Sequence, residues 1–182
     1  MRYFKKIEGE RIYLSPINVA DYPLYTKWFN DSAVTDGLGY TNVLSSLETE
    51  KEALEALSAD GYNFAIIRSA DDTLLGNMGF NDVNHRSRSA TCGLFIGEEE
   101  NRGKGYGTEA LILLLSHGFR TLNFHNIMLK VFSFNHAAIA CYKKVGFQEI
   151  GRRRQSYFLH GQYHDDVFMD MLSTEFFARY GK

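Results

Sequence analysis

The chain has 182 residues, 45% of them hydrophobic and 23% charged, and a formal net charge of −2. This length suits a single domain over residues 1–182 with a sizeable core, and the near-neutral charge argues against a nucleic-acid partner. The longest apolar run, residues 110–115, is too short to span a bilayer, so we expect no membrane partner. The start lacks an apolar signal core, and Cys92 and Cys141 lie in apolar segments, so we expect reduced thiols in a cytoplasmic protein.

The first half of the chain predicts the order strand, helix, helix, strand, strand. Asp21 is a candidate N-cap for the first helix, and Ser46 opens a capping signature before apolar residues at helical spacing. The two later strands are separated by a short polar turn, which predicts a hairpin. We expect strands over residues 11–17, 62–68 and 74–80, and helices that end near residues 29 and 57.

The second half predicts the order strand, helix, strand, helix, strand, strand, followed by a short helix. Asn135 is a good N-cap for the second of these helices, and Gly146 is a good C-cap for it. We expect strands over residues 89–97, 126–133, 147–158 and 162–172, and a deeply buried helix over 108–122. The whole order predicts one α/β domain with a mixed sheet.

Three glycines, Gly103, Gly105 and Gly107, lie between a predicted strand and the buried helix. Glycine lets the backbone approach an anion closely, and a helix N-terminus presents unpaired N–H groups and a positive dipole end. Arg102 and Lys104 add positive charge. The segment lacks the spacing of a Walker A loop or a dinucleotide fingerprint, which favours a pyrophosphate cradle without ATP or NAD. A tight turn with a helix cap is the alternative.

The pattern Arg102-x-x-Gly105-x-Gly107 resembles the R/Q-x-x-G-x-G/A signature of the GCN5-related N-acetyltransferases (GNAT superfamily). Residues 135–147, NHAAIACYKKVGF, resemble the N-x-x-A-x-x-x-Y-x-K-x-G-F element of the same superfamily. Segments near both ends, RIYLSPI, WFNDSAVT and HGQYHDDVFMDML, are similar to the ribosomal-protein N-terminal acetyltransferase branch, and the last also to spermidine acetyltransferases. The resemblance implies a mixed, mostly antiparallel central sheet flanked by helices.

The resemblance also implies the reaction and its site. Acetyl-CoA would be the cosubstrate, and an acceptor amine would attack the bound thioester directly. The main chain of the strand before the glycine loop would pair with pantetheine, and a backbone N–H of this strand would stabilise the oxyanion. The implied cofactor contacts are Leu94, Phe95, Ile96, Arg102, Gly103, Lys104, Gly105, Tyr106, Gly107, Thr108, Asn135, Ala138, Tyr142 and Lys144.

Tyr142 is the residue to which the resemblance assigns chemistry. A phenol has a pKa of about 10 and a thiol of about 8.5, so a phenol can protonate a departing thiolate. The alternative is a core aromatic residue on an amphipathic helix. Direct attack on the thioester needs no cysteine nucleophile, and no histidine pattern indicates a metal site.

The general base and the acceptor stay open at this point. Relatives often place a glutamate just before the cofactor strand, where this chain has Thr91 or Cys92, and the alternatives are Asp82, His85 and Glu98. The favoured acceptor is a protein or peptide N-terminus or a small-molecule amine, with residues 30–46 as a substrate loop. A polyamine or aminoglycoside is the second reading, with the glutamates at 48, 50, 52 and 55 lining an acidic pocket or forming a solvated face. A CoA-binding sensor without catalysis is the third, and the oligomer is a monomer or homodimer.

Overall fold

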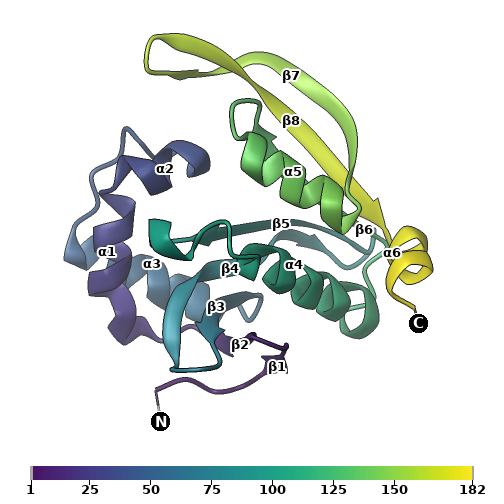
Figure 1. The fold of residues 1–182 in the computed structure, drawn as a ribbon, viewed down its shortest axis with the longest axis horizontal. Coiled ribbons are helices and arrows are strands. Elements are labelled where there is room, and N and C mark those ends of the chain that lie inside the picture. The colour runs from purple at the N-terminus through teal and green to yellow at the C-terminus, as the bar shows by residue number, and fades with distance from the viewer. Residues whose placement is uncertain (1, 182) are drawn as a thin grey trace. The chain divides into compact units, whose positions relative to one another are not determined.

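The computed structural model describes residues 2–181, and within them it contains eight strands and six α-helices (Figure 1). The strands are β1 (Ile7–Glu8), β2 (Ile12–Pro16), β3 (Asn63–Arg68), β4 (Thr73–Asn84), β5 (Ser89–Ile96), β6 (Asn126–Phe132), β7 (Gln148–Leu159) and β8 (Gln162–Leu172). The helices are α1 (Tyr22–Phe29), α2 (Ser32–Leu38), α3 (Leu47–Ala59), α4 (Tyr106–Ser116), α5 (His136–Val145) and α6 (Ser173–Tyr180).

The strands form one sheet in the order β1-β2-β3-β4-β5-β6-β8-β7. β5 and β6 pair in parallel, whereas β1–β2, β2–β3, β3–β4, β6–β8 and β7–β8 are antiparallel. The predicted mixed, mostly antiparallel sheet with flanking helices is therefore confirmed.

The chain divides into two compact units. The first comprises the residues up to 79 together with 94–113, and the second comprises 80–93 together with the residues from 114 onward. β4, β5 and α4 each contribute residues to both units. The prediction of one functional domain over residues 1–182 stays a prediction.

The core of the first unit is rich in aromatic side chains from α1 and β5. The ring of Phe95 packs edge-on against Tyr25, Trp28 and Phe29, with centroid distances of 6.1, 5.7 and 5.6 Å. Tyr25 and Trp28 are buried, so this cluster holds β5 against α1. The side chain of Phe95 is thus a core group, and any role in binding belongs to its main chain.

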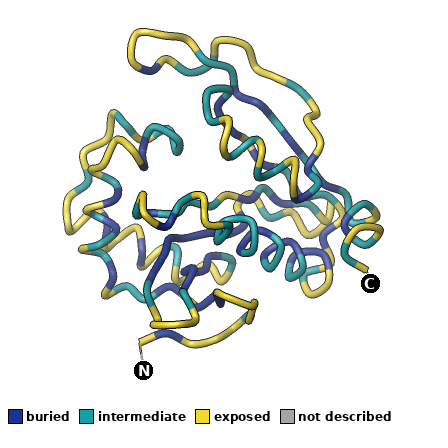
Figure 2. Tube along the Cα trace, viewed as in Figure 1, coloured by how far each residue is buried: buried dark blue, intermediate teal, exposed yellow. Residues whose placement is uncertain are grey.

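In the second unit, the β6–β8 pair has two faces of different character. Ile127, Leu129 and Val131 alternate along β6, lie opposite Met171, Met169 and Val167 of β8, and are all buried. The C-terminal end of α5 lies on this face, since a methyl group at Gly146 would approach Met171 Cε to 3.0 Å. The opposite face carries polar and aromatic side chains. Figure 2 shows the mostly exposed β7 beside the more buried β8.

The structure corrects the element predictions at several points. α2 lies within residues 30–46, which were expected to be loop, and its N-cap is Asp31, whose carboxylate accepts from Ala33 N–H (2.9 Å). This helix is short and contains Gly37, so its apolar spacing was too weak to detect. Asp21 does not cap α1, because its buried carboxylate accepts from Tyr3 Oη (3.0 Å) and pairs with Arg2.

The helix α4 also differs from its prediction. It begins at Tyr106, two residues before the expected start, and its last turn, His117–Thr121, is wound as a π-helix. The predicted caps Ser46 and Asn135 are confirmed, since their side chains accept from Thr49 and Ala138 N–H, both at 3.1 Å.

Candidate active site

The glycine loop leads from β5 into α4 and has the geometry of an anion cradle. Gly103 and Gly105 have φ angles of 71° and 87°, a region that side chains with a Cβ rarely adopt. The first hydrogen bond inside the helix runs from Glu109 N–H to the Gly105 carbonyl (3.1 Å). The N–H groups of the preceding turn therefore point out of the helix at the positive end of its dipole. Lys104 is exposed beside them.

Arg11, the residue before β2, makes several contacts with this loop and with the start of α4. Its backbone N–H and Nε donate to the carboxylate of Glu109 (2.8 and 2.9 Å), and its Nη1 donates to the Lys104 carbonyl (2.9 Å). Its guanidinium also lies over the ring of Tyr106, 5.2 Å from the centroid. Sequence reasoning missed Arg11 and Glu109, because residues 98 positions apart carry no local signal of their contact.

The guanidinium of Arg102 hydrogen-bonds to main-chain carbonyl groups, and its role in cofactor binding stays a prediction. Its guanidinium donates to the carbonyls of Ile96 (3.1 Å), Gly97 (2.8 Å) and Ala33 (2.9 Å). Its backbone N–H donates to the Glu99 carbonyl (2.9 Å). Arg102 thus binds the loop to the end of β5 and to α2. Three of its five N–H groups hold the shape of the cradle.

The edge of β5 is available where pantetheine was expected to pair. The ladder between β5 and β6 covers only Ser89–Thr91 opposite Asn126–Met128. The later residues of β5, including Leu94 and Ile96, have no β6 partner in the part of the chain that the structure describes. Strand edges with unpaired N–H and C=O groups accept an extended ligand by main-chain hydrogen bonds.

The helix α5 brings three of the four predicted residues of the second motif onto one face. Asn135, Ala138 and Tyr142 follow the spacing i, i+3, i+7, and side chains at this spacing lie above one another. Lys144 is two positions beyond Tyr142, so it projects from another face near the C-terminal end, where it is exposed. The geometry thus separates Lys144 from the other three residues.

Tyr142 sits in a position suited to a proton donor. Its side chain is half-buried, and its ring packs against Phe147 (6.0 Å between centroids). Desolvation raises the pKa of the phenol, and the nearby thiols of Cys92 and Cys141 raise it further. The phenol is therefore protonated at neutral pH. Burial also raises the pKa of the Cys92 thiol to about 12, so this thiol is not a nucleophile.

The candidate bases differ in the number of hydrogen bonds that their carboxylates already accept. The Glu98 carboxylate accepts from Lys27 Nζ (2.6 Å) and Trp28 Nε1 (3.0 Å), and these hydrogen bonds lower its pKa. Asp82 accepts from Thr91 Oγ1 (2.9 Å). Glu98 is thus a poor proton acceptor. Among residues 2–181, no three His, Cys, Asp or Glu side chains are grouped to hold a metal ion, and no helix has the length and apolarity to cross a membrane.

Comparisons with known proteins agree with this geometry. The model of the acetyltransferase (GNAT) domain family matches residues 11–148. The chain is 27% identical over 171 residues to the uncharacterized N-acetyltransferase p20 of Bacillus licheniformis, with 92% of this chain and 96% of that protein covered.

Two solved structures share the fold. Spermidine N-acetyltransferase from Vibrio cholerae in complex with CoA and spermine has a TM-score of 0.83 and 23% identity, over 92% of this chain and 99% of that one. RimL, the ribosomal L7/L12 α-N-protein acetyltransferase, in complex with CoA has a TM-score of 0.78 and 20% identity, over 90% and 95%. With the cradle, the open strand edge and the family model in agreement, this chain belongs to the GNAT family and is an acetyl-CoA-dependent N-acetyltransferase.

Proposed function

We propose that the acceptor is the α-amine of a peptide, a protein or a small molecule, and that Tyr142 is the general acid. The observation that supports acetyl-CoA binding in this proposal is the open β5 edge together with the left-handed glycine loop. Together they offer main-chain groups to an extended pantetheine arm and amide groups to a pyrophosphate. The N–H groups of residues 103–108 would hold the pyrophosphate, with Lys104 as the nearby cation.

In the proposed mechanism, the neutral amine attacks the thioester carbonyl. A β5 backbone N–H, that of Ile96, would stabilise the oxyanion. The C–N bond forms, the C–S bond breaks, and the thiolate takes the proton of the Tyr142 hydroxyl. Tyr142 regains a proton from solvent or from the acylated ammonium. Asn135 and Ala138, on the same face of α5 as Tyr142, would line the path of the cofactor arm.

The acceptor class is supported by the acid–base groups. An α-amine has a pKa near 7.7–8 and needs little help to lose its proton, whereas a polyamine or lysine amine near 10 needs a base. Glu98 already accepts two hydrogen bonds and has a lowered pKa, so the strand end supplies no strong base. An α-amine therefore fits this site better.

A polyamine is the second candidate, because a similar fold has been solved with spermine. The helix α3 would have to supply its acidic pocket. Glu48, Glu52 and Glu55 are exposed on that helix, and the buried Glu50 is bonded to the hydroxyl of Ser45. The three exposed carboxylates form a solvated face and Glu50 is already bonded, which weighs against a pocket for a polycation.

We further propose that both units work as one cytoplasmic acetyltransferase domain, as a monomer or homodimer. The family model spans residues of both units, which supports a single functional domain. Cys92 and Cys141 are both thiols, as in a reducing compartment.

The test is free-thiol release from acetyl-CoA with a panel of amines. The panel holds peptides with N-terminal Ser, Ala or Thr, spermidine, an aminoglycoside and free amino acids. We expect turnover on peptides or amino acids at pH 7.5 that exceeds turnover on spermidine by about tenfold or more. A preference for spermidine would support a polyamine as the acceptor. CoA binding without turnover on any amine would support a CoA-binding sensor that lacks catalysis.

A further inference from the structure

We propose that Arg11 is a positioning residue for the pyrophosphate of acetyl-CoA, because it joins the Glu109 carboxylate of α4 to the Lys104 carbonyl of the glycine loop. This inference rests on the proposed pyrophosphate cradle at residues 103–108 and names the residue that gives the cradle its shape. All three residues belong to the first compact unit.

The carboxylate of Glu109 lies in the first turn of α4, at the end of the helix where the pyrophosphate is proposed to bind. A negative charge at this place opposes a second anion, since both compete for the positive end of the helix dipole. The carboxylate accepts from the backbone N–H groups of Arg11 (2.8 Å) and Ile12 (3.3 Å) and from Arg11 Nε (2.9 Å). Only 16% of the Glu109 side chain is exposed, so water screens this ion pair weakly and Arg11 offsets the negative charge.

The Lys104 carbonyl determines the direction of one N–H group of the loop. It lies between Gly103 and Gly105, whose φ angles are 71° and 87°, and it accepts from Arg11 Nη1 (2.9 Å). This carbonyl and the Gly105 N–H belong to one trans peptide unit, so they point in opposite directions. Arg11 therefore directs the Gly105 N–H away from its own guanidinium. Glycine tolerates many backbone conformations, so this contact restricts a peptide unit that the glycines themselves leave free to rotate.

The backbone of Arg11 is itself held in place. Its carbonyl accepts from Ser69 N–H (2.9 Å), and the turn before β2 closes with a bond from Gly9 N–H to the Ile12 carbonyl (2.9 Å). This turn packs closely on α4, because a Cβ added at Gly9 would lie 2.7 Å from Glu109 Oε1. The side chain of Arg11 thus extends from a fixed backbone to both of its partners.

Arginine suits this role better than lysine. The planar guanidinium donates from Nε to Glu109 and from Nη1 to the Lys104 carbonyl at the same time. A lysine ammonium has the same charge but lacks the rigid fork of donors. The Arg11 side chain is 51% exposed, and exposed ion pairs contribute little to stability, so a substitution alters the cradle more than the fold.

The experiment compares ligands that differ in their phosphate groups. Calorimetry measures the binding of CoA and of dephospho-CoA, which keeps the pyrophosphate but lacks the 3′-phosphate, and it needs no turnover. Steady-state kinetics with the best amine of the panel compare acetyl-CoA with S-acetylpantetheine, which has the thioester but no pyrophosphate. Thermal melting shows that each variant is folded.

Two substitutions at Arg11 separate its charge from its shape. Arg11→Met should weaken CoA and dephospho-CoA about tenfold each and raise KM for acetyl-CoA to the same extent. It should leave kcat, and kcat/KM for S-acetylpantetheine, within about twofold of the wild type, since neither depends on the cradle. Arg11→Lys keeps the charge without the fork, and its CoA affinity should stay at least about threefold below that of the wild type.

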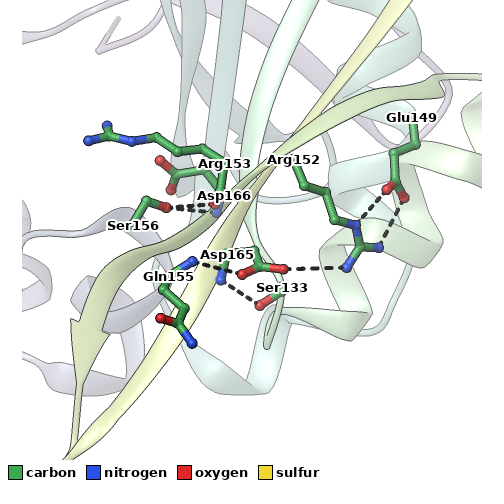
Figure 3. Close-up of polar contacts among 8 residues, drawn as sticks. All are labelled: Ser133, Glu149, Arg152, Arg153, Gln155, Ser156, Asp165 and Asp166. Carbon is green, nitrogen blue, oxygen red and sulfur yellow. Dashed lines mark hydrogen bonds and ion pairs between the residues drawn. The ribbon is translucent and has the colours of Figure 1, made fainter.

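Arg152→Met is the matched control. The guanidinium of Arg152 bonds to the Glu149 carboxylate (2.6 Å), and Figure 3 shows this pair on β7 of the second unit. The Arg152 side chain is 46% exposed, close to the 51% of Arg11, so the substitution removes the same charge from an ion pair of similar exposure. CoA affinity should stay within about twofold of the wild type.

An unchanged CoA affinity in Arg11→Met overturns the inference, and so does an equal loss with S-acetylpantetheine or in Arg152→Met. A loss with CoA that is absent with dephospho-CoA would assign Arg11 to the 3′-phosphate, and full affinity in Arg11→Lys would assign it a role by charge alone. Either result also overturns the positioning role. Arg11-dependent binding of CoA and dephospho-CoA without turnover of any amine leaves this inference standing and overturns the proposed function.

Discussion

Burial has two opposing effects on Tyr142 as a proton donor, because it keeps the phenol protonated and also makes it a weaker acid. Desolvation disfavours the charged phenolate, so the group keeps its proton over the pH range in which a thiolate leaves. The same argument excludes Cys92 as a nucleophile, because burial holds that thiol protonated too. A sequence can place an aromatic residue on a helix face, but only the packing around it decides which protonation state it holds.

Replacing the Tyr142 hydroxyl tests its role as the acid. Tyr142→Phe should reduce kcat by about tenfold or more and leave the dissociation constant of CoA unchanged, since the ring remains. Because the pKa of the phenol is raised, the wild-type kcat should not fall between pH 8 and pH 10. Tyr163→Phe, at an exposed tyrosine, is the control. Equal kcat values for wild type and Tyr142→Phe would remove Tyr142 from the chemistry.

At the scale of elements, the glycine loop depends on contacts that lie far apart in the sequence. Arg11, just before β2, bonds to the Lys104 carbonyl between the two left-handed glycines, and Arg102 bonds to the Gly97 carbonyl at the start of the loop. The three motif glycines are therefore not equivalent. Gly105 combines a φ of 87° with Arg11 Nη2 3.1 Å from the position of an added Cβ, whereas Gly107 has ordinary backbone and contacts.

Two alanine variants separate these roles. Gly105→Ala should lower Tm by about 4 °C or more and weaken CoA binding about tenfold, because the backbone is strained and the cradle shifts. Gly107→Ala should leave Tm within about 1 °C and CoA affinity within about threefold, since its Cβ would lie 3.4 Å from Leu94 Cδ1. Thermal melting and calorimetric titration with CoA measure both. Similar losses in the two variants would contradict a conformational requirement specific to Gly105.

At the scale of the whole molecule, several buried tyrosine and cysteine side chains make the free energy of unfolding decrease at alkaline pH. Burial raises the pKa values of Tyr3, Tyr25, Tyr142 and Cys92, and Asp21 contributes at Tyr3. Above the unfolded pKa values, the unfolded chain binds fewer protons than the folded chain, so the free energy of unfolding falls as pH rises.

This effect predicts a loss of stability that begins near pH 8.5 for the thiol and near pH 10 for the tyrosines. Each group that stays protonated in the fold contributes a loss of about 1.4 kcal/mol per pH unit above its unfolded pKa. Urea unfolding at pH 8 and pH 10.5 measures it. A Tyr25→Phe variant should show a shallower decline than the wild type between these values, and an identical slope would contradict the assignment.

Local patterns in the sequence determined much of this protein. The caps at Ser46 and Asn135 and the two motifs each lie within one short continuous stretch of the chain, so they can be recognised without the tertiary structure. These patterns were sufficient for the α/β class, the glycine loop and the Asn135–Tyr142 face of α5.

Only the tertiary structure decided which partners the charged side chains and hydrogen-bond donors have. The guanidinium of Arg102 is bound to three carbonyl groups, the Glu98 carboxylate to Lys27 and Trp28, and the glycine loop to Arg11. The position of the buried Asp166 carboxylate opposite Phe132 is likewise a product of strand register. Such pairings join residues tens of positions apart, and burial sets their energies, so no local pattern carries them.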